Sequence, residues 1–399
     1  MKNVYIAFAK RTPVGSFAGK LSSVRADDLL AHILKAHADW APYSLTEIDD
    51  VIIGCANQAG EDNRNVARMG VILADYPHEV PATTLNRLCG SSLDAVMDAF
   101  ARIQAGFGDC FLAGGVESMS RAPYVMSKGQ SAFARDQKIW DTSIGWRFEN
   151  PEMEKRFPLI SMGQTAEEVR RKHNIPREEQ DKWAFESHQK ATAAQKLGKF
   201  NDEIHPITIK TKKSEEIISA DEGPRPDSTL EKLSTLRAVF EKDGTVTAGN
   251  SSSINDGASL VMVCSEEFLK RHNLTPLVRI IGGAVHGLHP NVMGLGPVGA
   301  VEKVLTRYQL KKNQVDVFEL NEAFAAQVLG CMKELELDPS KVNQLGGSIA
   351  IGHPLGASGT RILSTLIHQM QRQPELKTGM ATMCIGVGQG IALAVENCR

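Results

Sequence analysis

The sequence predicts an α/β fold built from two similar halves, and three observations support this prediction. Short apolar runs of strand length alternate with amphipathic helical stretches along the 399-residue chain. Two distant segments share one layout, in which a small-residue turn is followed by a helix, a strand and a glycine-rich loop. A long polar stretch lies between them. We therefore expect two βαβ-rich halves with an inserted loop domain.

The strands are expected where β-branched and other apolar residues run together over six or seven positions. The clearest helix lies in the first half, where Leu93, Val96, Phe100 and Ile103 recur at helical spacing. Small residues at 90–92 precede it as cap residues, so this helix should start near residue 90. The expected strands are 4–9, 50–56, 109–115, 260–265, 278–284, 315–320 and 380–386.

An internal repeat relates the two ends of the chain. Residues 47–60 parallel residues 314–326, each with an acidic turn, a strand and a polar loop, and residues 88–118 parallel residues 353–390. Duplication of one α/β unit is the simplest explanation. We expect residues 1–118 with 249–270 to form an N-terminal half, residues 119–248 to form a loop domain, and residues 271–399 to form a C-terminal half.

The inserted segment 119–248 differs in character from both halves. A long polar stretch is followed by charged helical patterns around TAEEVRRKHN and REEQDKWAFESHQKATAAQKL. Trp140, Trp146 and Phe148 lie close together in the polar stretch. Long loops in compact proteins are often functional, and aromatic residues favour a packed one. The segment is expected to cover a substrate.

Composition excludes several classes of protein. With 45 basic and 47 acidic residues the net charge is −2, without the basic patch that binds nucleic acid. No apolar run reaches the roughly 20 residues that span a bilayer, and neither end carries a targeting signal, so we expect a cytoplasmic protein. The seven cysteines never show C-x-x-C spacing, which argues against a disulfide framework and against a zinc site.

The motif GLGPVG at 294–299 matches the dinucleotide pattern G-x-G-x-x-G. It does not follow directly on an expected strand, however, and Pro297 suits the first turn of a helix. A nucleotide cofactor is therefore not expected here.

Four polar residues stand out by position. Cys89 lies at the expected start of a helix, where backbone N–H groups and the helix dipole would lower the pKa of its thiol, although a packed cysteine is equally compatible. His353 is surrounded by small residues but could be structural. Cys384 ends a strand beside glycine N–H groups that could hold an oxyanion. Asn321 ends another strand, where it could simply cap a helix.

These motifs, in this order, resemble those of the thiolase family, which cleaves or forms acyl-CoA by Claisen chemistry. The resemblance covers nearly the whole chain and implies the five-layered αβαβα thiolase fold, with a CoA-covering loop domain at 119–248. The motifs that carry it are RTPVGSFAG, NRLCGSS, GGVESMS, TVTAGNSSSINDGA, NEAF, GGSIAIGHPLGASG and CIGVGQG.

The resemblance implies a role for each of these residues. Cys89 resembles the nucleophile that attacks a 3-oxoacyl-CoA, His353 its activating base, and Cys384 the thiol that protonates the leaving enolate. Ping-pong kinetics through an acyl-cysteine would follow. By similarity, His353 and a water held by Asn321 would stabilise the enolate, and the N–H groups of Cys89 and Gly386 the tetrahedral oxyanion.

The resemblance also implies ligands and assembly. Met162, Arg225 and Ser252 would contact coenzyme A, which with acetyl-CoA acts as a substrate. No metal and no permanently bound cofactor is expected, and the partner is a second copy of the chain in a homodimer or homotetramer.

The specific substrate is suggested by the segments 55–69 and 144–151, which look most like β-ketoadipyl-CoA thiolases of aromatic catabolism. A terminal carboxylate on the substrate would favour a nearby cation, for which Arg64, Arg147 and Lys128 are candidates. Ser161 stands where many acetoacetyl-CoA thiolases have His. Acetyl-CoA C-acetyltransferase and the medium-chain 3-ketoacyl-CoA thiolase of fatty-acid β-oxidation are the alternatives, and a ketosynthase-like enzyme, a cysteine hydrolase or an inactive scaffold are remote ones.

Overall fold

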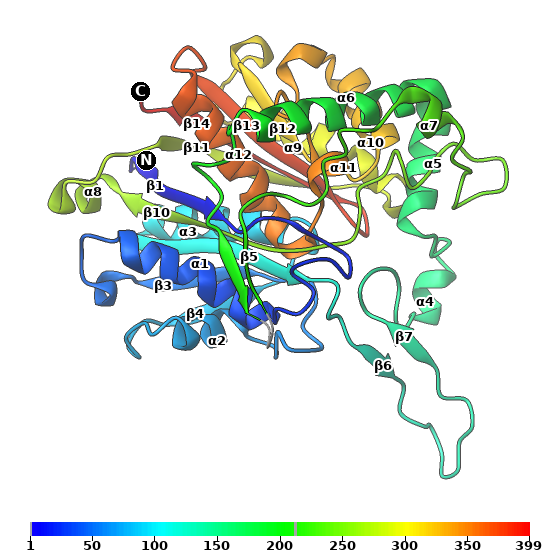
Figure 1. The fold of residues 1–399 in the computed structure, drawn as a ribbon, viewed down its shortest axis with the longest axis horizontal. Coiled ribbons are helices and arrows are strands. Elements are labelled where there is room, and N and C mark those ends of the chain that lie inside the picture. The colour runs from blue at the N-terminus through cyan, green and yellow to red at the C-terminus, as the bar shows by residue number, and fades with distance from the viewer. Residues whose placement is uncertain (1, 211–213) are drawn as a thin grey trace.

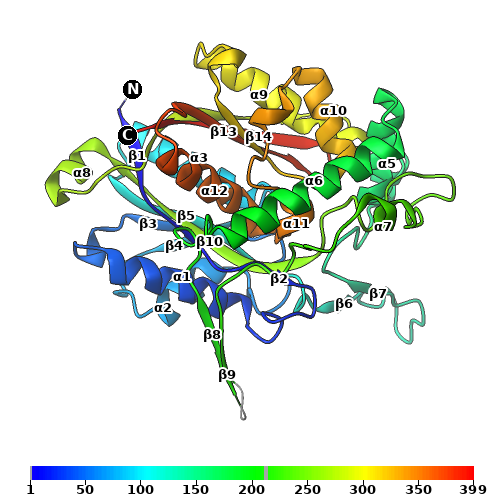
Figure 2. The same ribbon diagram turned by 45° about the horizontal axis from the view of Figure 1, so that its top comes forward.

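The structure is a computed structural model and describes residues 2–210 and 214–399. Helices and strands alternate in five layers, with a helix pair sandwiched between the two halves of a large sheet and further helices outside each half (Figure 1). Figure 2 shows the same layers from a second direction. The predicted five-layered α/β arrangement is confirmed.

The first four strands on either side of the centre of the large sheet follow one pattern, and β4 extends the N-terminal side by one strand without a counterpart. Outward from β1 (Val4–Arg11) lie β10 (Asn255–Ser265), β5 (Cys110–Ser118), β3 (Asp50–Gly54) and β4 (Ala82–Leu85), and β2 (Gly15–Ser16) also pairs with β10. Outward from β11 (Val278–Gly287) lie β14 (Gln389–Asn397), β13 (Thr378–Ile385) and β12 (Val317–Leu320). In each half the innermost pairs are antiparallel, whereas β5 with β3, like β13 with β12, is parallel. This symmetry is what the internal repeat predicted.

The central layer consists of α3 (Ser91–Ala105) and α12 (Ser358–Arg372). Leu93 and Val96 of α3 share a fully buried core with Ile362 and Leu366 of α12. The helices approach closely where Gly359 faces α3, since a Cβ on this glycine would lie 2.4 Å from the backbone nitrogen of Leu93. Both helices start at the same end of the sheet, so the loops that precede them converge.

Further helices cover the outer faces of the sheet. On the N-terminal half, α1 (Ala26–Trp40) and α2 (Val66–Leu73) share a core with β3, β5 and β10. On the C-terminal half, α9 (Gly296–Arg307) and α10 (Ala325–Leu335) pack on β12, β13 and β14. Pro297 lies in the first turn of α9, as predicted. The short helices α8 (Glu266–His272) and α11 (Ser348–Ile351) complete these halves.

The inserted segment contributes a projecting arm and a helical module. The arm is a hairpin of β6 (Tyr124–Met126) and β7 (Ile139–Asp141) with the connecting residues 127–138 at its tip (Figure 1). A second hairpin, β8 (Ile207–Lys210) with β9 (Glu215–Ile218), projects from another part of the molecule (Figure 2). The module contains α4 (Pro151–Glu154), α5 (Met162–His173), α6 (Arg177–Lys196) and α7 (Leu230–Ser234).

The inserted module is tied to the C-terminal half through one buried carboxylate. Glu322 accepts hydrogen bonds from Nε1 of Trp183 at 3.0 Å and from Oγ of Ser187 at 2.7 Å, both on α6. It also accepts from Nδ2 of Asn343 at 2.9 Å and from the backbone N–H of Ile349 at 3.1 Å. A buried carboxylate with this many donors is fully compensated, so Glu322 fixes α6 against the loops of the C-terminal half.

All seven expected strands are present, but β4, β14 and the short strands β2, β6, β7, β8 and β9 were not predicted. The strand β14 starts four residues after β13 ends, so no spacer separates the two strands in the sequence. The seven cysteines are unpaired, and five of them are buried. Within residues 2–210 and 214–399, no helix combines the length and apolar character needed to cross a membrane. Across the same residues, no group of three His, Cys, Asp or Glu side chains is arranged to hold a metal ion.

Candidate active site

Cys89 lies in a tight turn immediately before α3. Leu88 has a φ of 50°, which is rare for a non-glycine residue and typical of functional turns. Ser91 Oγ donates to the carbonyl of Leu88 at 2.6 Å and closes the turn. Gly90 packs closely on the C-terminal half, since a Cβ there would lie 2.5 Å from Cδ1 of Ile385 at the end of β13 and the isoleucine side chain would have to shift. The turn therefore packs directly on the C-terminal half.

The surroundings of the Cys89 thiol favour its protonated form. Burial raises its pKa to about 11, although the backbone N–H groups of Gly386 and of Cys89 itself hydrogen-bond the sulfur and oppose this shift. The prediction that the helix start lowers the pKa of Cys89 is therefore wrong, because desolvation outweighs the helix dipole. The thiol needs a base to become a nucleophile. The same two N–H groups are arranged to receive negative charge near the sulfur.

The ring of His353 is oriented by the hydroxyl group of Ser358 and the side-chain amide of Asn321. Ser358 Oγ donates its proton to the carbonyl of Pro354 at 2.8 Å, so it accepts from Nδ1 of His353, 2.6 Å away. Nδ1 consequently carries the hydrogen, and Nε2 keeps its lone pair. Burial lowers the pKa of His353 to about 3, so the ring is neutral. This is the tautomer in which Nε2 accepts a proton.

Asn321 presents its amide nitrogen to that lone pair. Its Nδ2 lies 3.4 Å from Nε2 of His353, and its Oδ1 accepts a hydrogen bond from Oγ of Ser348 at 2.6 Å. Ser348 in turn accepts from the buried guanidinium of Arg361. The short chain from Arg361 to Asn321 decides which end of the amide faces His353, so the two side chains expected to stabilise the enolate lie next to each other.

Cys384 lies in β13, one residue before the strand ends, and is buried among apolar side chains that include Met162 and Phe324. Burial raises the pKa of this thiol well above its usual value, and charge on Cys89 adds to the effect. The two thiols are thus within electrostatic reach of each other. Cys384 is therefore protonated at rest, so its proton is present for transfer to a base as strong as an enolate.

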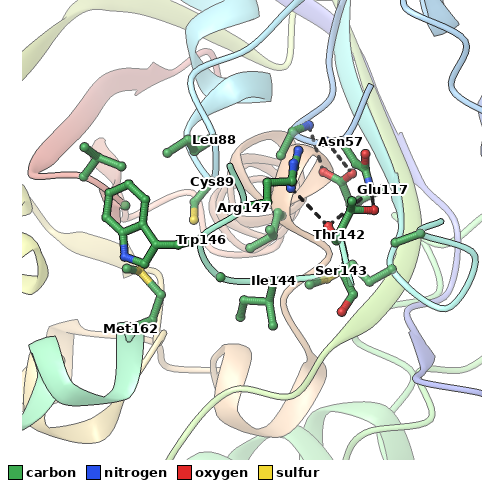
Figure 3. Close-up of a pocket in the computed structure, with 17 residues that line it drawn as sticks. Asn57, Leu88, Cys89, Glu117, Thr142, Ser143, Ile144, Trp146, Arg147 and Met162 are labelled. Atoms are coloured by element: carbon green, nitrogen blue, oxygen red, sulfur yellow. Dashed lines mark hydrogen bonds between the residues drawn. The ribbon is translucent and has the colours of Figure 1, made fainter. Parts of the chain in front are cut away.

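A cavity of about 260 Å³ opens beside Cys89, and Gly386, Met162 and Leu355 also line it, whereas His353, Asn321 and Cys384 do not. Leu355 belongs to the His353 loop. In Figure 3, Trp146 and Met162 lie on one side of Cys89, whereas Asn57, Glu117, Thr142 and Arg147 lie on the other. The cavity therefore has an apolar side and a polar side. Trp146 is fixed by a hydrogen bond of 3.0 Å from its Nε1 to the carbonyl of Ile160.

Glu117 is a residue of this site that sequence analysis did not single out. Its buried carboxylate accepts hydrogen bonds from the backbone N–H groups of Ala56 at 2.9 Å, Asn57 at 3.0 Å and Gly356 at 2.8 Å. Burial raises its pKa to about 7. It joins the cavity wall to the His353 loop. Its place in the motif GGVESMS, as the one acid between glycines and serines, was the available signal.

The residues expected to contact coenzyme A fall into two places. Met162 lines the first cavity, and Arg225 lines a second cavity of about 350 Å³. Ser252 does not line either one, but both its neighbours, Ser251 and Ser253, line the second. Ser161 caps α5. Its Oγ accepts a hydrogen bond from the backbone N–H of Gln164 at 3.4 Å, and Oε1 of Gln164 accepts one from the backbone N–H of Ser161 at 2.9 Å.

The three candidate cations are separated by the structure. Arg147 lines the cavity that contains Cys89 and is half-buried. Arg64 and Lys128 are exposed and line neither cavity.

Comparisons with known proteins cover almost the whole chain. Residues 4–267 match the family model described as "Thiolase, N-terminal domain", and residues 274–397 match "Thiolase, C-terminal domain". The chain is 51% identical to a "Beta-ketoadipyl-CoA thiolase" of Pseudomonas aeruginosa over 99% of both chains. It is 50% identical to the "3-oxoadipyl-CoA/3-oxo-5,6-dehydrosuberyl-CoA thiolase" of Escherichia coli, over 99% of this chain and 100% of the relative.

Solved structures agree with these relatives. The human mitochondrial 3-ketoacyl-CoA thiolase superposes with a TM-score of 0.93 at 41% identity, over 99% of both chains. An acetyl-CoA acetyltransferase of Bacillus anthracis superposes equally well, with a TM-score of 0.93 at 40% identity, over 100% of this chain and 99% of the other.

Proposed function

The chain belongs to the thiolase family, and we propose that its substrate is β-ketoadipyl-CoA, which it cleaves with coenzyme A to succinyl-CoA and acetyl-CoA. Membership makes it an acyltransferase that acts on 3-oxoacyl-CoA with coenzyme A as a second substrate. The observation that carries the choice of substrate is the half-buried Arg147 in the wall of the cavity beside Cys89. The names of the relatives at about 50% identity support this substrate, and a role in aromatic catabolism is part of the proposal.

The first half-reaction, as proposed, forms an acyl-cysteine. Nε2 of His353 takes the proton of Cys89, and the sulfur attacks the C3 carbonyl of the substrate. Because the pKa of Cys89 is high and that of His353 low, the neutral pair is favoured at rest. Proton transfer is therefore coupled to attack, which is general-base catalysis. The tetrahedral oxyanion accepts hydrogen bonds from the backbone N–H groups of Cys89 and Gly386, which already hydrogen-bond the sulfur.

Collapse of this intermediate breaks the bond between C2 and C3. The electron pair becomes the enolate of acetyl-CoA, whose oxygen is stabilised by His353 and by a water held on Asn321. Cys384 donates a proton to C2, acetyl-CoA leaves, and the succinyl group stays on Cys89.

In the second half-reaction the Cys384 thiolate removes the proton of coenzyme A. The resulting sulfur attacks the succinyl thioester, and Cys89 leaves and recovers its proton from His353. Every proton is returned, so the cycle balances. Because one product leaves before the second substrate reacts, the kinetics are ping-pong.

The inserted segment 119–248 is proposed to cover coenzyme A as part of the expected three-part division of the chain. His188, Arg225 and Ser228 of this segment line the second cavity beside Ser251 and Ser253, which supports a contact from Arg225 to coenzyme A. Met162 lines the first cavity and Ser252 lines neither, so their contacts to coenzyme A are proposed from the family resemblance alone. The protein is proposed to be a cytoplasmic homodimer or homotetramer. Apolar side chains exposed on the projecting arm, such as Tyr124 and Phe133, support association of copies.

Steady-state kinetics at saturating coenzyme A test the substrate. We expect kcat/KM for β-ketoadipyl-CoA to exceed that for 3-oxohexanoyl-CoA by about ten- to a hundred-fold, because a charge-assisted bond forms only with the former. Acetoacetyl-CoA serves as the short control. If the uncharged six-carbon substrate reacts equally well, the enzyme is a broad 3-ketoacyl-CoA thiolase instead.

The acylated residue is tested separately. Incubation with acetyl-CoA alone, followed by peptide mass spectrometry, should find the acetyl group on Cys89. An adduct on Cys384 with Cys89 unmodified overturns the proposed roles.

A further inference from the structure

Arg147 lies in the wall of the cavity beside Cys89 and forms no ion pair there with a described residue. It follows β7 in the inserted segment, is half-buried, and forms no ion pair with any residue that the structure describes. The hydrogen bond it makes runs from Nη1 to the carbonyl of Thr142 and is long, at 3.4 Å. Among the described residues that line this cavity, it is the basic one. A guanidinium with so little local compensation is available to a ligand.

A chain of hydrogen bonds fixes the carbonyl that Arg147 contacts. Asn57 donates its N–H to Glu117 at 3.0 Å and its Nδ2 to Thr142, at 3.0 Å to Oγ1 and 3.3 Å to the carbonyl. Thr142 Oγ1 donates to the carbonyl of Pro123 at 2.6 Å. Figure 3 shows these residues together on the side of the cavity opposite Trp146 and Met162. Arg147 is thus held at a wall anchored to the sheet through Glu117.

The acids near Arg147 that the structure describes form no ion pair with it. Glu117 uses its carboxylate on three backbone N–H groups and belongs to the polar wall itself. Asp62 is buried, and burial raises its pKa to about 6 although Arg147 acts to lower it. Asp62 accepts the N–H of Gly60 at 3.0 Å and forms no ion pair with Arg147. The nearby Arg121, in contrast, is paired with Glu61.

We infer that Arg147 binds the terminal carboxylate of the acyl group while that group is attached to Cys89. This inference rests on the proposed function. It names the residue that would distinguish a dicarboxylic acyl group from a monocarboxylic one. The planar fork of arginine matches a carboxylate with two parallel hydrogen bonds, and Cys89 and Arg147 line one cavity of about 260 Å³, so a succinyl group has its two ends at the two polar features it requires.

The test compares two substrates in four variants. Arg147→Gln should lower kcat/KM for β-ketoadipyl-CoA by about ten- to a hundred-fold and change that for 3-oxohexanoyl-CoA far less. Arg147→Lys, which keeps the charge but loses the fork, should fall between wild type and Arg147→Gln. Arg64→Gln and Lys128→Gln remove the two exposed cations outside the cavity and should leave the ratio of the two kcat/KM values within about two-fold.

A second measurement isolates the acyl-enzyme. Succinyl-CoA should acylate Cys89 of wild type faster than butyryl-CoA does, and Arg147→Gln should remove this difference. The acyl group of acetyl-CoA carries no terminal carboxylate. Acetyl-CoA should therefore acylate wild type and Arg147→Gln at similar rates, which shows that the variant is folded.

The outcomes separate this inference from the proposed function. If wild type prefers β-ketoadipyl-CoA and Arg147→Gln keeps the preference, the inference is wrong while the substrate stands. An equal loss with both substrates in Arg147→Gln, or a preference lost in Arg64→Gln or Lys128→Gln, also overturns it. If wild type shows no preference, the proposed substrate itself fails. If Arg147→Gln does not fold, an Arg147→Lys variant with the full wild-type preference in both assays refutes the role of the fork.

Discussion

Replacement of Ser358 by Ala tests whether the tautomer of His353 matters. Ser358 is fully buried, and its Oγ accepts from Nδ1 of His353 at 2.6 Å while donating to the carbonyl of Pro354. The alanine variant leaves the Nδ1 hydrogen without a partner in a buried site. It also removes the group that keeps the hydrogen off Nε2, so the imidazole is free to adopt the tautomer that cannot accept a proton from Cys89.

The magnitude follows from the cost of an unsatisfied buried donor, about 1–3 kcal/mol. If this cost is borne by the reactive tautomer, acylation slows by roughly 5- to 150-fold, at about 1.4 kcal/mol per factor of ten. The assay is single-turnover acylation of Cys89 by acetyl-CoA, quenched and quantified by mass spectrometry. Thermal unfolding, followed in parallel, reports whether the variant keeps its fold.

The same helix offers a matched control. Ser364 of α12 is also fully buried, but its Oγ has no hydrogen-bond partner in the structure. Ser364→Ala therefore removes an identical group at similar depth and should leave acylation unchanged. If Ser358→Ala acylates Cys89 as fast as wild type, or if Ser364→Ala is slowed equally, the derivation of the tautomer is refuted.

Two further predictions concern a thiol and a buried imidazole. Cys384→Ser should still be acylated at Cys89 but lose turnover by roughly 100-fold or more, because a hydroxyl is too weak an acid to protonate the enolate; near-normal turnover removes Cys384 from the mechanism. His37 is buried between two tyrosine hydroxyls, and burial lowers its pKa to about 3. Below a pH of about 6.5 the unfolded chain therefore binds a proton that the folded chain does not, and stability falls by up to about 1.4 kcal/mol per pH unit. His37→Asn lacks this titration, so its unfolding free energy should not show the loss. The difference in unfolding free energy between wild type and His37→Asn, measured by urea titration, should therefore narrow by about 2 kcal/mol between pH 6.5 and pH 5.0. An unchanged difference contradicts the lowered pKa of His37.

Much of the fold was predictable because its signals are local. Apolar runs of strand length identify seven strands, and the repeat predicts that the two halves carry equivalent strands. The mirrored strand order across β1 and β11 bears this out. The strand β14 was missed because it follows β13 after a short glycine-rich turn, where Val387 has a φ of 62° and Gly388 a φ of 79°. A hairpin this tight leaves no spacer that separates two strands in a sequence pattern.

Part of the candidate site was also predictable from local sequence signals, and part of it was not. Motifs single out Cys89, His353 and Cys384 as candidate reactive residues, since each lies in a short run of small residues whose backbone conformation is specified nearby. The role of Glu117 was not predictable, because the three N–H groups it accepts come from residues 56, 57 and 356, which only the packing of the two halves brings together.

Residue type and spacing along the chain were enough to predict the α/β class, the duplication and a set of candidate reactive residues. The tertiary structure decided two other matters. Desolvation by both halves raises the pKa of Cys89, against the local effect of the helix start. Of three candidate cations, only Arg147 lines the cavity with Cys89. Burial and distance between remote segments depend on how layers pack, and no local pattern contains that information.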